Sequence, residues 1–421
     1  MLTPAFKLHQ DADFLVVEIK APYTKVSDAE IFFEDDDFCF SSTPYYLRLT
    51  LPGKVIEDDK ATAKYEADTG TFVVSMTKQQ PGEMFEGLDL LTKLLTPRCP
   101  KKSPSIQVLG DEPIDCKIDQ VPWTTQDEEA LKLGSRHYGF ARRSTGVVAR
   151  LMDAIPDLVD IRDPEHKSLK ESRDERELLE KQHFNEEHYL ADLYDNDAIE
   201  DLLVEPATTR PALFSNEEKA RLCRLPRREY LMEKGMRHTM LLGLADVLFA
   251  YAYDLRINQG EHCVESAWTI SKLSATLSWF EEFDSAKSVV RSCVRRSLCY
   301  PLYRSWDLAL RVLGDVISFL HRGTICVVQC LLDLHTILEQ HDSRFVLNQL
   351  YIDDYAAWSQ HLGAATLKEL AQQLSEVHLS KSDLDLDLEE LEAGADAALA
   401  EQAAALADSV ATLQIDSDDS E

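Results

Sequence analysis

Glycine is scarce in this chain of 421 residues, which contains 15 of them. Loops that cradle nucleotides need glycines at fixed spacings, and neither Gly-x4-Gly-Lys-Ser/Thr nor Gly-x-Gly-x-x-Gly occurs. The Gly-x-Ser-x-Gly pattern of hydrolases and the His-Glu-x-x-His pattern of zinc proteases are also absent. No spacing places a nucleophile beside a base. We therefore expect a protein that is not an enzyme and has no cofactor or metal, and an enzyme with an undetected Cys and His site is the weakest alternative.

Signals of export are missing as well. The nine cysteines are odd in number and scattered, no Cys-x-x-Cys pair occurs, and no Asn-x-Ser/Thr sequon is present. Charged residues appear by Lys7, too early for a basic-then-apolar signal segment. These absences favour a reducing compartment, the cytosol or nucleus. The most apolar run, residues 240–253, contains Asp246 and is shorter than the roughly 20 residues that cross a bilayer, so it predicts a buried core helix.

Positive charge is in short supply. Lys and Arg total 44 against 75 Asp and Glu, a net charge of -31. Residues 381–421 hold 13 acidic residues and one lysine, so the remaining 380 residues carry -19. Such a field repels free nucleic acid and anionic membranes and attracts a basic protein. The plainer interpretation is that the charge serves solubility alone. We expect no direct nucleic-acid binding and no membrane association.

Residues 1–95 are predicted to form strands. Apolar runs bounded by turn residues cover residues 14–19, 31–33, 38–40, 45–51 and 71–76. The acidic segment 34–37 has the composition of a turn between two of these runs, and Pro52-Gly53 is expected to end another. Short strands with turns at this spacing are typical of a sandwich or barrel.

The pattern changes after residue 95. Five prolines interrupt the segment that follows, and residues 96–123 are expected to be a linker. From residue 124 to residue 378 apolar side chains recur at spacings of three and four, which predicts an all-α domain. Within it, the charged run 171–181 is typical of a solvated helix face. Residues 379–421 have too few large apolar groups to compensate for ordering entropy, so we expect a disordered acidic tail.

Several side-chain groups in the helical part admit a chemical role and a plainer one. Cys326 and Cys330 are four residues apart on an apolar helix, and buried thiols filling the core are favoured over a metal or redox pair. His183 and His188 lie near acidic residues, but a separation of five residues points them in different directions on a helix. No third ligand stands at zinc-like spacing, so we do not expect a metal site there.

One stretch of the helical part is basic and has no acidic residue within it. Its cationic side chains are Lys287, Arg291, Arg295, Arg296 and Arg304. They either grip phosphate or an acidic partner segment, or pair with neighbouring acidic helices. Aromatic side chains interleave with charged ones at residues 251–272 and 300–306, and such residue types dominate protein interfaces. Amphipathic core helices carry the same types, so both interpretations stay open.

Two parts of the sequence resemble known families. Residues 14–22 and 45–53 resemble the CS domain, which is related to the α-crystallin sandwich. The block LADVLFAYAYDLR at 244–256 is similar to the helical domain of the SHQ family, as are four further blocks, at residues 138–140, 187–192, 260–274 and 298–304. The order of the two domains also matches. The resemblance implies an N-terminal all-β CS (α-crystallin-like) sandwich at 1–95, an all-α helical SHQ domain at 124–378 and then the disordered acidic tail.

The SHQ resemblance implies a non-enzymatic assembly chaperone for box H/ACA ribonucleoproteins, found in the nucleoplasm and cytosol. Members of that family bind the dyskerin-type pseudouridine synthase and occupy its RNA-binding surface before guide RNA is loaded. The resemblance also implies release by the AAA+ ATPases pontin and reptin. The CS resemblance alone implies the alternative, a general co-chaperone or adaptor of the large heat-shock chaperone.

The matching blocks supply the first candidates for contact with the synthase. They are the aromatic and charged residues Tyr253, Asp254, Arg256, Glu261, Glu265, Trp268, Tyr300 and Arg304. The sequence does not separate those that reach a partner from those that fill the core.

Overall fold

The computed structural model describes residues 1–58, 60–90, 94–95, 135–204 and 210–418, and for residues 406–418 it describes the helix alone. The linker predicted at 96–123 and the start of the helical domain at 124 lie outside the described residues. The chain divides into two compact units. Unit 1 comprises Met1–Leu158, Lys219–Glu229 and Leu338–Ala357, and unit 2 comprises Val159–Glu218, Tyr230–Ile337 and Trp358–Glu421.

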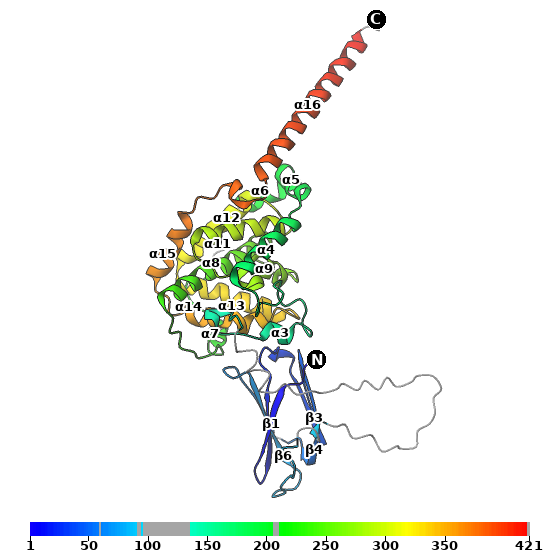
Figure 1. Cartoon of the computed structure of the whole chain (residues 1–421), viewed down its shortest axis with the longest axis vertical. Helices are drawn as coiled ribbons and strands as arrows, with labels where there is room; N and C mark the ends of the chain where they lie inside the picture. Colours follow the sequence, from blue (N-terminus) through cyan, green and yellow to red (C-terminus); the bar gives the residue numbers. More distant parts are fainter. Residues whose placement is uncertain (59, 91–93, 96–134, 205–209, 419–421) are drawn as a thin grey trace, which may run out of the picture. The chain divides into compact units, whose positions relative to one another are not determined.

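Unit 1 contains an antiparallel β-structure. Its strands are β1 (Ala5–Gln10), β2 (Phe14–Lys20), β3 (Glu30–Ser42), β4 (Tyr45–Ile56), β5 (Thr62–Glu66) and β6 (Thr71–Lys78). Their order is β1-β2-β6-β4-β3, and β5 pairs with β6. Because β4 pairs with β6 only at Val55 and Ile56, the sheet folds into two layers there (Figure 1). The rings of Phe40 and Phe72 meet in the core between the layers, with centroids 4.9 Å apart. The all-β N-terminal prediction is confirmed.

The acidic segment 34–37 is not a turn, contrary to the prediction. Strand β3 runs through it, and two cations of β4 pair with its carboxylates across the strands. Arg48 lies 2.7 Å from Asp37, and Lys54 lies 3.1 Å from Asp35. The pairing register of β3 on β4 shifts between Asp35 and Asp37, which accommodates the acidic segment as a bulge.

Pro52-Gly53 does not end β4, which was the second wrong expectation for this domain. It marks the point where β4 leaves β3 and turns to β6. Gly53 is required there, because a Cβ atom would lie 2.1 Å from Cε1 of Phe85. The Phe85 ring is buried and closes over the strand at this point. Strands β1 and β5 have no clear apolar run and were not predicted.

Unit 1 also includes helical segments from later in the chain. They include α3 (Val147–Leu151) and the π-helical turn η3 (Asn348–Ile352). The backbone N–H of Tyr23 donates to Oε1 of Gln349 at 2.7 Å, and the N–H of Arg227 donates to Asp68 at 3.3 Å. The compact unit therefore extends beyond the predicted domain boundary at residue 95.

Unit 2 is helical and holds the longest buried helix, as predicted. Its helices are α4 (Leu169–His183), α5 (Glu186–Tyr194), α6 (Asp197–Val204), α8 (Lys234–Ile257), α9 (Ser266–Leu273), α10 (Ala275–Trp279), α11 (Ala286–Cys299), α12 (Trp306–Arg322), α13 (Thr324–Gln340), α15 (Ala364–Ser375) and α16 (Leu388–Asp418) (Figure 1). The last residues of α13 and most of α7 (Asn216–Leu222) and α14 (Asp353–Ser359) are counted with unit 1. Between residues 135 and 378, the described part contains no strand, and its one isolated bridge joins Tyr138 and Ser144.

The start of the acidic tail is ordered, which corrects the prediction of disorder from residue 379. A short 3-10 turn, η4 (Lys381–Leu384), precedes α16. The anchors of this segment are three buried leucines: Leu384, Leu386 and Leu388. The residues between these leucines, Asp385 (φ 55°) and Asp387 (φ 54°), have left-handed backbone conformations. An average over the composition of the tail does not detect this local alternation.

The aspartates of the same segment face the basic stretch of α11. Asp383 accepts a hydrogen bond from Lys287 at 2.9 Å, and Asp385 accepts from Arg291 at 2.6 Å. Beyond it, α16 is helical rather than disordered, since Ala, Leu and Glu favour helix. Tyr189 donates to Glu392 at 2.5 Å and fixes the start of α16 to α5. The helical unit therefore extends past residue 378.

Candidate partner-binding surface

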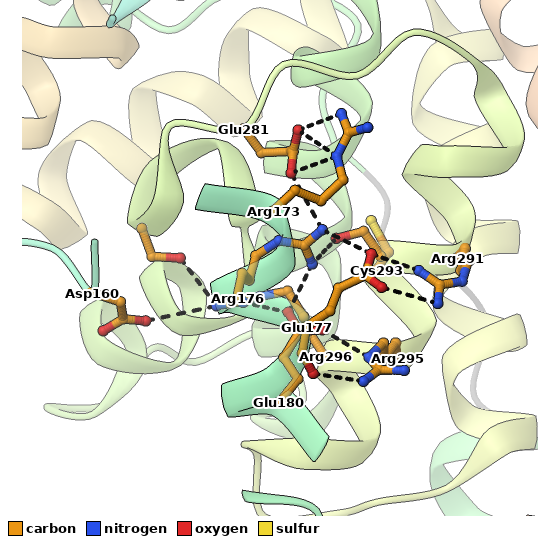
Figure 2. Close-up of polar contacts among 12 residues, drawn as sticks. Asp160, Arg173, Arg176, Glu177, Glu180, Glu281, Arg291, Cys293, Arg295 and Arg296 are labelled. Carbon is orange, nitrogen blue, oxygen red and sulfur yellow. Dashed lines mark hydrogen bonds and ion pairs between the residues drawn. The ribbon is translucent and has the colours of Figure 1, made fainter. Parts of the chain in front are cut away.

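A buried cluster of arginines and glutamates joins α4 to α11. Glu180 is 0 % exposed and accepts hydrogen bonds from Arg176 and Arg296 at 2.8 Å and from Arg295 at 2.9 Å. Figure 2 shows these guanidinium groups converging on the carboxylate. The prediction that residues 171–181 form a solvated face is therefore wrong for one side of α4, which is buried.

Charge compensation explains how this cluster tolerates burial. Burial opposes the charge of Glu180, yet the three guanidinium groups around it lower the pKa of its carboxyl group. Glu281 accepts from Arg173 at 2.8 Å and from Arg176 at 3.3 Å, which extends the network across α4. The cations of the basic stretch that lie on α11 are thus paired with acidic groups, which confirms the plainer interpretation for them. The cluster fixes the C-terminal end of α11, which is followed in the chain by the candidate residues Tyr300 and Arg304.

Three of the eight predicted contact residues lie on α8 and are buried. The hydroxyl of Tyr253 donates to the carbonyl of Tyr303 at 2.5 Å, and burial raises its pKa. Asp254 accepts from Nδ1 of His262 at 2.8 Å. Arg256 donates to both carboxylate oxygens of Asp315, at 2.5 and 2.7 Å. Tyr253 and Asp254 thus hold two neighbouring turns against α8, whereas Arg256 joins α8 to α12, so all three side chains are used inside the domain.

The other five residues reach the surface wholly or in part. Glu261 and Glu265 are exposed in the turn before α9, and Trp268 is half-buried on α9 itself. Nζ of Lys272 lies 6.0 Å from the Trp268 ring centroid and 5.8 Å from that of Tyr300. Lys272 therefore connects the two aromatic side chains by cation–π contacts.

Tyr300 and Arg304 flank the turn between α11 and α12. The Arg296 guanidinium lies 4.9 Å from the Tyr300 ring centroid, and burial raises the pKa of Tyr300 to about 12. The backbone N–H of Arg304 donates to Asp192 at 2.6 Å. Its Nε and Nη1 atoms are buried and have no hydrogen-bond partner in the described part of the chain.

Sequence reasoning missed two exposed apolar residues in the same turns. Val264 is 88 % exposed and Leu302 is 65 % exposed. Both stand inside the blocks that carried the family resemblance, and an apolar residue in a turn between amphipathic helices was the signal that could have identified them. We name the loop surface by its members: Glu261, Val264, Glu265, Trp268, Tyr300, Leu302 and Arg304.

The geometry of α8 brings the two turns of the loop surface together. Tyr253 holds the turn before α12, and its neighbour Asp254 holds the turn before α9. Aromatic, arginine and exposed apolar side chains with a charged rim are the composition of a protein-binding interface. The loop surface therefore offers a protein partner both apolar contact area and hydrogen-bond donors.

Metal-binding side chains do not cluster in the parts of the chain that the structure describes. No cluster of three or more His, Cys, Asp or Glu side chains is placed to hold a metal ion among those residues. Cys326 and Cys330 are both buried, as predicted for core thiols, and burial raises the pKa of Cys330 well above its ordinary value. Over the same described residues, no helix has the length and apolar character needed to span a bilayer.

An N-terminal CS sandwich followed by a helical domain defines the class of this protein, and comparisons with known families agree. Residues 3–95 match the SHQ1-like CS domain family. Residues 204–388 match the Shq1 domain of the SHQ1 protein family, so this match includes the buried leucine segment.

Individual relatives cover most of the chain. The Protein SHQ1 homolog of Mus musculus is 39 % identical over 94 % of this chain and 75 % of its own length. The Protein SHQ1 homolog of Xenopus tropicalis is 39 % identical over 94 % of this chain and 70 % of its own length. Protein shq1 of Schizosaccharomyces pombe is 33 % identical over 93 % of this chain and 96 % of its own length. The chain belongs to the SHQ1 family.

Proposed function

We propose that this chain is an assembly chaperone of box H/ACA ribonucleoproteins. It binds the dyskerin-type pseudouridine synthase, covers the RNA-binding surface of that subunit and leaves when guide RNA is loaded. The observation that carries the proposal is membership in the SHQ1 family through both domains, in the same order. In this proposal the chain acts by binding and not by catalysis, in the nucleoplasm and cytosol.

Electrostatics supports the choice of partner. A surface that binds RNA presents Lys and Arg to phosphates, and an acidic protein competes for it through the same attraction. The net charge of -31 suits that role. The loop surface adds apolar and aromatic groups, which give a protein partner affinity beyond charge alone. Release by pontin and reptin is part of the proposal. A general co-chaperone role would rest on the CS sandwich alone.

Shortening the two exposed apolar side chains of the loop surface tests the contact. Full burial of a Val or Leu side chain by a partner stabilises a complex by about 1.5–3 kcal/mol relative to exposure. The double variant Val264→Ala with Leu302→Ala should therefore weaken synthase binding by roughly 10- to 100-fold, measured by titration calorimetry with the full chain.

A matched control uses one valine and one leucine elsewhere in unit 2. Val204 and Leu213 are 82 % and 77 % exposed and lie outside the loop surface. Val204→Ala with Leu213→Ala should leave the affinity within about twofold. Equal losses in both double variants would remove the loop surface from the proposal.

Competition with guide RNA tests occupancy of the RNA-binding surface. Guide RNA should displace the chain from the synthase, and the affinity of the chain should fall as salt rises, because the attraction is screened. Native mass spectrometry of the mixture distinguishes exchange from addition. A stable particle with synthase, guide RNA and this chain together would count against the proposal.

A further inference from the structure

A groove lies between the first turns of α8 and the helix α15. Its volume is about 560 Å³. The side chains that line it are Lys234, Arg237, His238, Leu241, Thr366, Glu369, Leu370 and Gln373. All of them belong to unit 2, and none is a member of the loop surface. The groove is therefore a separate feature that the proposed function does not use.

The basic side chains of this groove differ from those of α11, because no described residue pairs with them. Lys234, Arg237 and His238 are exposed, and among the described residues none of their side chains has a hydrogen bond or an ion pair. They line a groove in a chain of net charge -31, and one carboxylate, that of Glu369, lines it with them.

The backbone adds to this positive potential. The 24-residue helix α8 begins at Lys234, and the N-cap residue Glu233 makes no side-chain capping bond. The first N–H groups of a long helix attract an anion, because the partial charges of the peptide units sum there. The side chains and the helix end thus favour the same kind of ligand.

The lining also includes two apolar side chains. Leu241 of α8 is half-buried, and Leu370 of α15 is buried. Thr366 and Gln373 add polar groups on the α15 side. A bare phosphate would use the basic side chains and leave the accessible part of Leu241 uncovered. A peptide with acidic and apolar side chains would use both.

The chain itself shows how such a peptide binds. Asp383 and Asp385 pair with Lys287 and Arg291 of α11, while the leucines between and after them are buried. The groove between α8 and α15 likewise presents two basic side chains and a partly accessible leucine, with no segment of the described chain in place. Basic side chains of one helix surface in this fold therefore already hold an aspartate–leucine segment.

We propose that the groove between α8 and α15 binds an acidic, leucine-containing peptide segment of a partner protein. The inference goes beyond the proposed function, because this surface has the opposite sign to the acidic field that suits an RNA-binding subunit. Nucleic acid is disfavoured as the occupant, because the rest of the chain repels a long polyanion, whereas a short peptide engages only the groove.

The test uses the full chain and a fluorescein-labelled peptide, SDLDLDLEE, which copies residues 382–390. Fluorescence anisotropy should show saturable binding at low salt. The double variant Lys234→Glu with Arg237→Glu should weaken it by about tenfold or more, because two attractive charges become repulsive. Both residues are exposed and have no partner in the part of the chain that the structure describes, so the melting temperature should change little.

The matched control reverses two exposed cations elsewhere, Lys170→Glu with Arg224→Glu, and produces the same change in net charge. It should alter the peptide affinity by no more than about twofold. A second peptide with glycine in place of each leucine should bind about tenfold more weakly, because it cannot cover the accessible part of Leu241. Equal losses in both charge variants, or equal binding of both peptides, would overturn the proposal. Displacement of the peptide by an equimolar RNA 12-mer would reassign the groove to nucleic acid.

Discussion

Removal of the charge of Glu180 is the sharpest test of what holds unit 2 together. Glu180→Gln preserves the shape of the side chain but leaves three guanidinium groups around a neutral amide. Breaking a buried ion pair by removing one partner costs about 3–5 kcal/mol. For a cooperative unit of about 200 residues, each kcal/mol lowers the melting temperature by roughly 2–4 °C. We therefore expect a decrease of about 6–20 °C, measured by scanning calorimetry of the full chain at neutral pH.

Glu177→Gln is the matched control on the same helix. Glu177 pairs with Arg291 at 2.8 Å, but its side chain is 30 % exposed, and exposed pairs contribute about 0–1 kcal/mol. Its melting temperature should fall by no more than about 4 °C. Equal shifts in the two variants, or no shift in either, would refute the claim that the buried cluster is a main source of stability.

The pH dependence gives an independent check with a definite sign. The pKa of Glu180 is lowered in the folded state, so its contribution is present above the unfolded pKa of about 4.3 and is lost as pH falls through the folded value. The difference in melting temperature between the native chain and Glu180→Gln should therefore be constant from pH 7 to about pH 5 and should narrow below about pH 4. A difference that widens on acidification would contradict the assignment of an ionised carboxylate.

Two further predictions concern stability. Gly53→Ala should destabilise the sandwich by about 1–3 kcal/mol in urea unfolding, because the new methyl group would overlap the Phe85 ring, whereas Gly235→Ala, which meets no atom within 4 Å on a helix, should stabilise by about 0.5–1 kcal/mol. Arg256→Lys should cost about 1.5–3 kcal/mol, because lysine cannot make the two-pronged contact with Asp315, and an unchanged melting temperature would show that this pair is dispensable.

The fold was predictable where apolar residues recur with one clear spacing, every second residue for a strand or every third and fourth for a helix. The alternation of β4 and the spacing of apolar residues in α8 identified the sandwich and the core helix. The predictions were wrong for two acidic segments, where a high density of like charge was taken to exclude regular structure. The acidic segment 34–37 lies within a strand, where basic residues of β4 pair with its carboxylates, and such pairs cannot be read from a single stretch of sequence.

The candidate site was predictable by region but not by residue. Tyr253 and Trp268 are both aromatic residues in matching blocks, yet one is buried and the other is half-buried at the surface. Helical periodicity does not separate buried from exposed aromatic residues here, because α8 is buried on nearly all sides and so has no clear exposed face. The exposed apolar residues Val264 and Leu302 stand in turns, and their exposure follows only from where α8 holds those turns.

The ordered aspartate–leucine segment sets where a fragment of this protein can safely end. A truncation at residue 378 would remove Leu384, Leu386 and Leu388 and expose the surface that buries them. It would also remove Asp385, one of the carboxylates that pair with Arg291. Such a fragment would expose apolar and cationic groups where the longer chain exposes carboxylates. It would aggregate or bind polyanions through this patch. A binding assay made with the fragment would then measure the newly exposed patch and not a surface of the longer chain.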